Sequence, residues 1–317
     1  MAETQQKTAT RAAYGKALVK LGELNPDVVV LDADLSKSTK TDGFAKNFPD
    51  RFIQMGIAEA DMMGTAAGLA ASGKIPFASS FAIFASGRAY DQVRQTAGYG
   101  RLNVKIGASH GGITVGEDGA SHQSIEDLAL MRVIPGMTVI VPADAVETEQ
   151  AVFAAARHEG PVYIRTGRSP VPAVFDEKYE FKIGKAATVR SGKDVTIIAC
   201  GVMLPVSLEA ADILSEKGIS ARVLNMATIK PVDVEAVTRA AEETGAIVTA
   251  EEHSIIGGLG SAVCEVVCEV CPVPVERIGV RDVFGQSGTA DELMKAYSLT
   301  SDDIVRAAVR AIERNGT

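Results

Sequence analysis

The chain of 317 residues contains no tryptophan, only four cysteines and four histidines, and 5% aromatic residues. Four cysteines in a chain of this length do not make the disulfide framework of a small secreted domain. No apolar stretch approaches the roughly 20 residues that span a bilayer, and the longest, residues 195–206, is broken by Gly201 and Pro205. The N-terminal sequence MAETQQKTATRAAYGKAL is polar where a signal peptide carries its apolar segment. We therefore expect a cytoplasmic protein with reduced thiols that does not enter a membrane.

Positive charge is also scarce, because 32 lysines and arginines face 40 aspartates and glutamates, which gives a net charge of −8. No run of five or six basic residues occurs, so nucleic acid is not an expected partner. Hydrophobic residues make up 46% and charged residues 23%, as in ordinary globular proteins, which argues against disorder. At roughly 150 residues per domain the length indicates two domains, with one large barrel as the alternative.

Short apolar runs alternate with longer amphipathic segments along the chain. In the first half we expect strands at 28–31, 76–80, 104–109, 138–142 and 162–166, and helices near 10–24, 59–72, 86–99, 123–132 and 144–158. The second half repeats the alternation, with strands at 195–200, 221–226, 246–252 and 273–280, and helices near 205–217, 232–243, 259–270 and 302–314. Nearly continuous apolar strands are typical of parallel sheets covered on both faces. We therefore predict an α/β fold of two doubly wound domains with mostly parallel sheets, residues 1–172 and 191–317, joined by a Pro- and Gly-rich linker at 173–190.

Glu59 is the first candidate for chemistry. It begins a predicted helix of small and apolar residues in the segment GIAEADMMGTAAGLAASGK, where Gly56, Gly64 and Gly68 allow close approach of a ligand. A carboxylate in apolar surroundings suits a proton donor or a charged hydrogen-bond acceptor. The alternative is an acidic residue that is simply favoured near a helix N-terminus.

Two of the few aromatic residues, Phe81 and Phe84, follow the predicted strand at 76–80. Such rings can form a stacking wall for a planar heterocycle. Ordinary packing in the hydrophobic core is the alternative.

The Gly-rich segment KIGASHGGITVGEDGASHQSIEDL contains His110 and His122, with Glu117 and Asp118 between them. It follows a predicted strand, and ligands of α/β proteins bind at loops on the carboxyl ends of parallel strands. Two histidines with acids between them suit hydrogen bonding to a polyhydroxylated substrate and proton transfer near pH 7. Zinc ligation and the capping of backbone groups are the alternatives.

Two further features are candidates for binding an anion. Arg165 stands at the end of the predicted strand 162–166, where a guanidinium can bind an anion with two hydrogen bonds; an exposed arginine at a domain edge is the alternative. The sequence GGLGSA at 257–262 is similar to an anion-binding turn at a helix start, but we favour tight packing of helix on strand as its explanation.

The cysteines at 264, 268 and 271 have the CxxxCxxC spacing of radical iron–sulfur enzymes. The same spacing places Cys264, Cys268 and Cys271 on one face of a helix. Those enzymes carry their motif early in a barrel, whereas only 317 − 271 = 46 residues follow Cys271 here. We therefore favour a structural role for the three thiols.

Taken together, two segments resemble the C-terminal half of transketolase: GIAEADMMGTAAGLAASGKIPFASSFAIFASGRAYDQVR and ASHGGITVGEDGASHQSIEDLALMRVIPGMTVIVPADAVET. The chain is most similar to the kind of transketolase that is split into two polypeptides. The resemblance covers nearly the whole chain, as a pyrimidine-binding domain to about residue 172 and then a transketolase C-terminal domain. It implies transfer of a two-carbon ketol unit from a ketose phosphate to an aldose phosphate, with thiamine diphosphate as cofactor.

The resemblance also implies roles for single residues. Glu59 matches the glutamate that contacts the aminopyrimidine ring of thiamine diphosphate and favours its imino tautomer. Phe84 matches the aromatic residue that stacks on that ring, with Phe81 beside it. On the substrate side the matching residues are His110, which we also expect to be catalytic, Asp118, His122 and Arg165, the last at the position of the arginine that binds substrate phosphate.

Three features depart from the family pattern. Gly87 stands where many full-length transketolases have a further aromatic residue, and the upstream serine that helps to hold phosphate is not recognised, with Tyr14 in TRAAYGKAL standing nearby. The chain also has no Gly-Asp-Gly motif, through which the family holds the diphosphate and a divalent cation, Mg²⁺ or Ca²⁺. The resemblance therefore implies half an active site. An N-terminal transketolase subunit would supply the metal site in an α₂β₂ assembly.

Relatives in the same superfamily are the alternatives. Deoxyxylulose-phosphate synthases generally lack a histidine at the position of His110, and the β subunits of 2-oxo-acid dehydrogenases lack the GEDG sequence that contains Asp118. A non-catalytic regulatory homologue is a further alternative, which the presence of Glu59, Phe84 and His122 disfavours.

Overall fold

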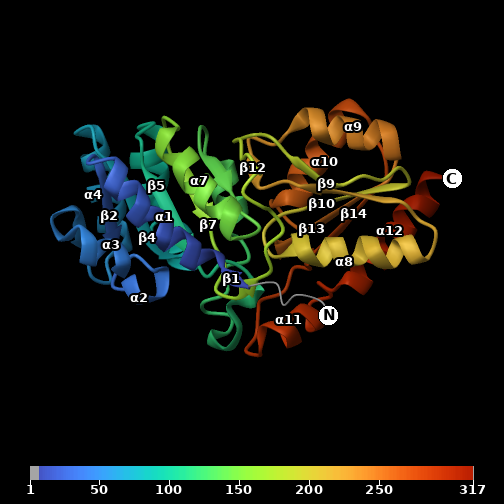
Figure 1. Ribbon diagram of the computed structural model, residues 1–317, viewed down its shortest axis with the longest axis horizontal. Helices are drawn as coiled ribbons and strands as arrows, with labels where there is room; N and C mark the ends of the chain where they lie inside the picture. The colour runs from blue at the N-terminus through green and yellow to red at the C-terminus, as the bar shows by residue number, and fades with distance from the viewer. Residues whose placement is uncertain (1–6, 317) are drawn as a thin grey trace.

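The computed structural model describes residues 7–316 as two α/β lobes that lie side by side (Figure 1). The first lobe contains a seven-stranded sheet with all strands parallel except β12 at one edge. In spatial order its strands are β12 (Thr228–Lys230), β6 (Thr138–Ile140), β7 (Val162–Arg165), β5 (Lys105–Ser109), β4 (Ile75–Phe81), β2 (Val28–Asp32) and β3 (Phe52–Gln54).

Helices cover both faces of this sheet because side chains along each strand alternate between two apolar clusters. Val30 of β2 packs in the cluster beneath α1 (Thr10–Leu24) and α7 (Ala145–Arg157), whereas Leu31 packs in the cluster beneath α4 (Glu59–Ala71) and α6 (Asp127–Val133). Two short helices, α2 (Ser36–Thr39) and α3 (Asp42–Asn47), follow β2. The first lobe is therefore doubly wound, as the sequence predicts.

The second lobe contains a five-stranded sheet in the order β14 (Val275–Val280), β13 (Ile247–Ser254), β10 (Val195–Ala199), β11 (Ala221–Asn225) and β9 (Ala187–Arg190), with only β9 antiparallel. Helices α8 (Met203–Glu216) and α12 (Ser301–Asn315) cover one face, and α9 (Val234–Thr244) and α10 (Leu259–Val270) cover the other (Figure 1). Together the two lobes confirm the predicted fold class of two α/β domains with mostly parallel sheets.

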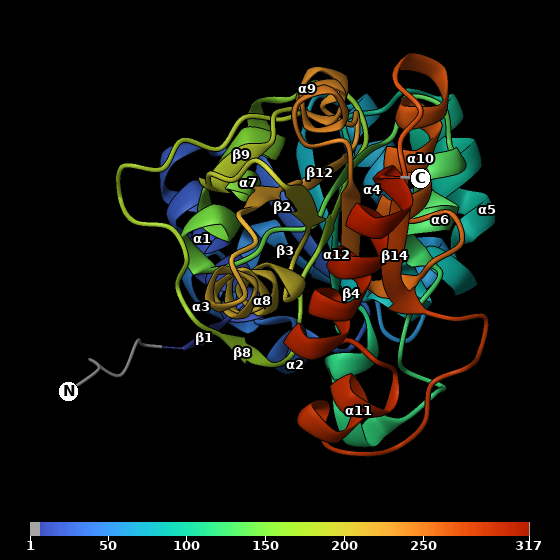
Figure 2. The same cartoon turned by 90° about the vertical axis from the view of Figure 1, so that its right-hand side faces the viewer.

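Several short strands were not predicted by the sequence pattern, and one of them, β12, crosses from the second half of the chain to the first sheet. Strand β12 comes from the second half of the chain but pairs antiparallel with β6 of the first sheet, and β9 lies inside the segment expected to be a linker. Near the N-terminus, β1 (Thr8–Ala9) pairs with β8 (Pro170–Val171). Helix α11 (Ala290–Ala296) packs against η4 (Ile113–Asp118), so the second lobe contacts the Gly-rich segment of the first (Figure 2).

The helix predicted at 86–99 differs from a regular α-helix. It consists of the π-helical segments η2 (Phe84–Arg88) and η3 (Val93–Tyr99) with α5 (Tyr90–Gln92) between them. π-Helical turns are rare and occur frequently at functional sites. Among residues 7–316, no helix has the length and apolar character that a membrane crossing requires.

Candidate active site

The predicted site residues gather where β3, β4 and β5 end. Glu59 follows β3 as the first residue of α4, Phe81 ends β4 and Phe84 begins η2, and His110 comes directly after β5. These strands are parallel, so their carboxyl ends meet at one edge of the sheet. This edge is the usual ligand-binding edge of an α/β domain.

The carboxylate of Glu59 is buried and forms an ion pair with Arg88. Its side chain is 1% exposed, and both carboxylate oxygens lie 2.9 Å from Nη1 of Arg88. The Arg88 side chain is half exposed, and its Cζ lies 4.4 Å from the centroid of the Phe84 ring. The half-exposed guanidinium of Arg88 therefore lies between the Glu59 carboxylate and the face of the Phe84 ring.

His110 is held by its neighbours in a defined protonation state. Its ring stacks on Phe81 at a centroid separation of 3.8 Å, its Nδ1 lies 2.9 Å from Oγ of Ser109, and its Nε2 lies 3.3 Å from Nη1 of Arg11. A guanidinium can only donate, so Nε2 accepts and the proton sits on Nδ1, which donates to Ser109. Burial, with the positive charges of Arg11 and Arg168 nearby, lowers the pKa of His110 to about 3. The imidazole is neutral at physiological pH.

The second histidine of the Gly-rich segment completes an aromatic cluster. His122 meets Phe84 edge-on at a centroid distance of 5.5 Å and Phe81 at 6.1 Å. Its Nδ1 lies 2.9 Å from Oγ of Ser121. The two phenylalanines thus bring together His110 and His122, which are twelve positions apart in the sequence.

Asp118 lies beside an arginine that the sequence analysis missed. Its Oδ2 is 3.9 Å from Nη1 of Arg168, which also lies 3.0 Å from Oε2 of Glu117 and donates to the carbonyl of Val115. Arg168 stands in TGRSP, just past the end of β7, where a side chain is free to turn toward a loop. The position of Arg168 just after strand β7, at the carboxyl edge of the sheet, could have identified it as a candidate from the sequence.

Arg168 is one of three cations around a cavity of about 370 Å³ next to His110. Arg11, Lys40 and Arg168 line this cavity together with backbone of the η4 segment. Arg11 also donates to the carbonyl of Ser38, 2.9 Å away, so the segment that carries Ser38 lies at the rim. Three positive charges against the single carboxylate of Glu117 make this cavity a candidate site for an anion.

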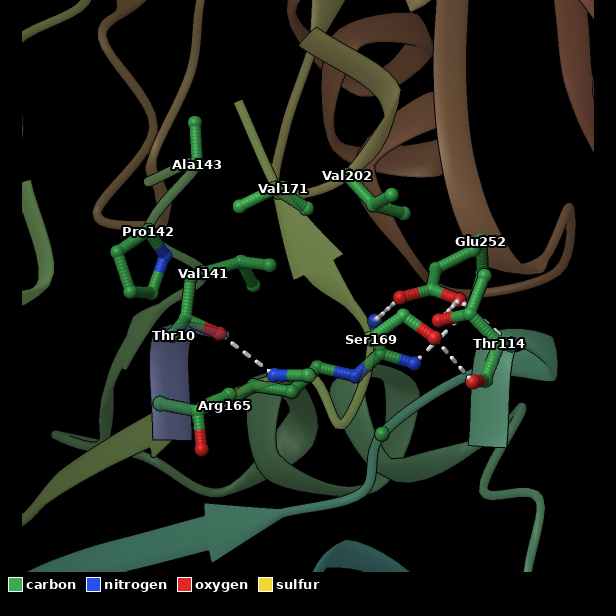
Figure 3. A pocket seen from close by; sticks show the side chains of 14 residues that line it. Thr10, Thr114, Val141, Pro142, Ala143, Arg165, Ser169, Val171, Val202 and Glu252 are labelled. Carbon is green, nitrogen blue, oxygen red and sulfur yellow. Dashed lines mark hydrogen bonds and ion pairs between the residues drawn. The ribbon is translucent and has the colours of Figure 1, made fainter. Parts of the chain in front are cut away.

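The structure places Arg165, expected to bind substrate phosphate, inside the protein. Its side chain is 3% exposed, its Nε lies 2.9 Å from Oδ2 of Asp127, and its Nη2 donates to the carbonyls of Ser124 and Glu252, each 3.1 Å away. Burial opposes the charged form, but Asp127 and Glu252 outweigh it, so the pKa of Arg165 is raised. The guanidinium is thus engaged by Asp127 and by two backbone carbonyls, and Arg165 also lines the small cavity drawn in Figure 3.

Tyr14 is likewise absent from the site edge. It is 1% exposed, and its hydroxyl lies 2.8 Å from Oγ of Ser79. A Cβ at Gly107 would lie 1.9 Å from the Tyr14 oxygen, so the ring packs directly against β5. Tyr14 therefore belongs to the core and does not replace a phosphate-binding serine.

The alternative metal sites are not found among the described residues. Within residues 7–316, no three His, Cys, Asp or Glu side chains come together in a way that would hold a metal ion. Cys264 and Cys268 lie on α10 and Cys271 follows its end, with free thiols that range from half-buried to exposed.

The comparison with protein families decides the relationship. Residues 6–173 match the family "Transketolase, pyrimidine binding domain", and residues 184–304 match "Transketolase, C-terminal domain". The chain belongs to the transketolase family. Its membership confirms the resemblance inferred from the sequence motifs.

Relatives within the transketolase family include separate subunits of the same length. The chain is 49% identical to a putative transketolase C-terminal section of Methanocaldococcus jannaschii, over 96% of each chain. It is 48% identical to a 6-deoxy-6-sulfo-D-fructose transketolase subunit of Clostridium sp. strain MSTE9, over 96% of this chain and 94% of that one. It is 42% identical to an apulose-4-phosphate transketolase subunit of Phocaeicola vulgatus, over 96% and 98%.

Solved structures agree with these relatives. A split-gene transketolase, described as an inactive β4 tetramer, is 55% identical and superposes with a TM-score of 0.91 over 98% of this chain and all of that one. Transketolase from Leishmania mexicana is 26% identical with a TM-score of 0.85, and the whole of this chain covers 47% of it. The chain thus matches the full length of separate subunits and about half of an unsplit transketolase.

Proposed function

We propose that this chain is the C-terminal subunit of a split transketolase and that it transfers a two-carbon ketol unit between sugar phosphates together with an N-terminal subunit. The observation that carries the proposal is the meeting of Glu59, Phe84 and His110 at one sheet edge, in a chain without a Gly-Asp-Gly motif. The residues for a pyrimidine ring and a sugar are present, and the motif for a diphosphate is not.

The residues at this edge fit the aminopyrimidine of thiamine diphosphate. Glu59 offers a buried carboxylate whose counter-ion, Arg88, is half exposed and able to move aside. Phe84 and Phe81 offer aromatic faces beside it, their rings parallel within 10° and 5.9 Å apart. In the proposed complex the Glu59 carboxyl would hydrogen-bond ring nitrogen N1′ of the pyrimidine, and Phe84 would stack on the ring. The bound cofactor supplies the nucleophilic carbon that the side chains of a protein lack.

The substrate side rests on His110 and the cationic cavity. Neutral His110 offers Nε2 as an acceptor, so it accepts a hydrogen bond from a sugar hydroxyl when Arg11 turns to an anion. We assign binding of the terminal phosphate to Arg11, Lys40 and Arg168, which replace Arg165 in this role. We assign the remaining hydroxyls to Asp118, which lies 3.9 Å from Arg168, and to His122, which lies beside Phe84.

The names of the relatives support an anionic sugar as the substrate class. A 6-sulfo-fructose and an apulose 4-phosphate both carry an anionic group remote from the keto carbon. A cavity lined by three cations suits either group. We therefore propose a ketose with a terminal phosphate or sulfonate as donor.

The partner supplies the other half of the site in this proposal. An N-terminal subunit with a Gly-Asp-Gly motif holds the diphosphate and its Mg²⁺ or Ca²⁺, and two such sites related by a twofold axis give an α₂β₂ assembly. The relative solved as a β4 tetramer is described as inactive, which supports dependence on a second subunit. The four free cysteines fit a cytoplasmic location, where thiols stay reduced.

Reconstitution tests the proposal. We expect the purified chain alone to show no ketol transfer and to bind thiamine diphosphate weakly in calorimetry. Addition of the N-terminal subunit is expected to restore both, and the cofactor is then expected to raise the melting temperature of the complex by mass action. Tight Mg²⁺-dependent cofactor binding and full ketol transfer by this chain, in a preparation free of any second polypeptide, would refute the half-site proposal.

A further inference from the structure

A carboxylate of the second lobe holds the Gly-rich segment of the first. Glu252 lies on β13 with its side chain 6% exposed, and its Oε2 accepts hydrogen bonds from the backbone N–H of Thr114, at 3.1 Å, and from Oγ1 of Thr114, at 2.8 Å. Thr114 stands between His110 and Asp118 in the chain. Figure 3 shows the carboxylate pointing at Thr114 across the boundary between the lobes.

The side chain of Glu252 packs closely against the backbone of the Gly-rich segment. A Cβ at Gly112 would lie 2.3 Å from the carboxyl carbon of Glu252, so the backbone of the segment rests directly on this side chain. Arg165 reinforces the same junction, because its Nη2 donates to the carbonyls of Ser124 and Glu252 and its Nη1 lies 4.0 Å from Oε1 of Glu252. A carboxylate so buried, with a cation and two donors, is satisfied only in this arrangement of the two lobes.

The segment needs such an anchor because its backbone is strained. Gly112 and Gly116 take φ values of +85° and +84° that glycine adopts without strain, whereas His110 has a φ of +59°, in the left-handed region that residues with a side chain rarely adopt. Conformations of this kind persist only where surrounding contacts hold them. On the second-lobe side, besides Glu252, the carbonyl of Gln286 accepts from Nε2 of Gln123 at 2.9 Å.

We propose that Glu252 is a positioning residue for the sugar substrate: through Thr114 it fixes the spacing of His110 and Asp118, although it touches no substrate itself. The second lobe then contributes to turnover by holding the substrate segment in its strained conformation. The inference rests on the proposed ketol transfer, since it names what the segment is positioned for. Small displacements of positioned groups cost rate and affinity out of proportion to the contact removed.

The test compares Glu252→Ala with Glu251→Gln in the complex with the N-terminal subunit. Glu251 is the neighbouring buried carboxylate on β13, but it accepts from the backbone N–H groups of Leu259 and Gly260 within its own lobe. We expect Glu252→Ala to raise the KM for the ketose donor about tenfold or more, with a smaller effect on kcat and no change in cofactor affinity. Glu251→Gln is expected to lower the melting temperature and to leave this KM unchanged.

Two conservative variants keep the test informative if Glu252→Ala folds poorly. Glu252→Gln retains an oxygen acceptor for Thr114 and is expected to restore most of the wild-type KM. Thr114→Val removes only the Oγ1 donor at 2.8 Å and is expected to raise KM severalfold. The effects of Thr114→Val and Glu252→Ala on KM, combined in one chain, are expected to be less than additive, because both remove parts of one contact.

Hydrogen exchange separates this inference from the proposed function. The Thr114 amide is protected by Glu252, so peptides covering residues 111–118 are expected to exchange at least tenfold faster in Glu252→Ala than in Glu251→Gln. Faster exchange with no ketol transfer by the wild-type complex would overturn the function and leave the anchoring intact. An active wild-type complex, with exchange and donor KM unchanged in Glu252→Ala, would overturn the positioning role.

Discussion

The two lobes share one architecture but treat the carboxyl ends of their strands differently. In the first lobe the buried carboxylate at this edge, Glu59, is paired with a half-exposed arginine. In the second lobe Glu251 occupies the equivalent edge, and its oxygens lie 2.7 and 2.8 Å from the backbone N–H groups of Leu259 and Gly260 at the start of α10. The free N–H groups at the start of α10, which could otherwise bind an anion from solution, are thus already bonded to the carboxylate of Glu251. The donors of the GGLGSA turn are therefore used within the protein, whereas the carboxylate of Glu59 is paired only with the half-exposed Arg88.

The backbone differs in the same sense. Around the first site, His110 and Lys40 have φ values of +59° and +69°, and the helix at 84–99 contains two π-helical segments. In the second lobe, the helices α11 and α12 start with complete capping boxes at Thr289 and Thr300. Positive φ values at non-glycine residues also occur in the second lobe, at Asp282 and Ser298, so the contrast lies in the π-helical segments of the first lobe and the capped helices of the second. In the proposed function, the same fold therefore serves as a reactive edge in one lobe and as a support in the other.

The contrast between the two lobes is tested most directly by removing the charge of Glu59 in one variant and of Glu251 in another. Glu59→Gln, in the complex with the N-terminal subunit, is expected to lower the rate of ketol transfer about 10²- to 10⁴-fold, because an amide supplies no acidic proton. Its stability is expected to change little, since a pair with a half-exposed arginine contributes under about 1 kcal/mol. Glu251→Gln is expected to behave oppositely: it loses about 1–3 kcal/mol of stability and retains the rate.

Turnover and thermal unfolding of both variants check this contrast. Asp61→Asn is the matched control, because this carboxylate lies exposed in the first turn of the same helix as Glu59 and has no proposed role. A Glu59→Gln complex that keeps more than half of the wild-type rate would contradict the assignment of Glu59.

Two arginines three residues apart give the second contrast. Arg165→Ala leaves the buried Asp127 carboxylate without its counter-ion and is expected to cost about 3–5 kcal/mol of stability. Arg168→Ala breaks a pair with Glu117, whose side chain is 66% exposed, and is expected to leave the stability nearly unchanged. It is instead expected to raise the KM for a phosphorylated donor by about 10- to 150-fold, the effect of one lost charge-assisted hydrogen bond of about 1.5–3 kcal/mol.

Denaturant unfolding and donor kinetics measure the two effects. A sugar without a terminal phosphate is the control, because its KM is expected to be the same in Arg168→Ala and in the wild type. The reassignment from Arg165 to Arg168 would be wrong if Arg165→Ala unfolded normally and alone raised the KM for the phosphorylated donor.

Arg165 and Arg168 also illustrate which features of the fold and site can be predicted from the sequence. The apolar runs predicted most strands of both sheets to within two residues, because buried parallel strands carry their pattern locally. They could not predict β12, three residues long and paired with β6 from the other lobe, since such pairing leaves no local periodicity. Arg165 is the last residue of β7 and Arg168 follows three residues later, and Arg165 is held inside the protein by Asp127, 38 positions away. Motif spacing finds the loop, and long-range packing decides which side chain on it is free.

The smallest effect concerns the stability of the isolated chain in acid. The unfolded chain takes up a proton on a histidine near pH 6.5, whereas His110 in the folded chain resists protonation until about pH 3. Between these values the unfolded state binds more protons, so stability falls as the pH falls below 6.5. His110→Asn lacks this linkage, and its loss of stability between pH 7 and pH 4.5 is expected to be smaller than that of the wild type by about 2.5 kcal/mol. Urea unfolding at the two pH values measures the difference. Equal losses in both proteins would show that the His110 site is more open to water than its stacking on Phe81 and its contact with Arg11 indicate.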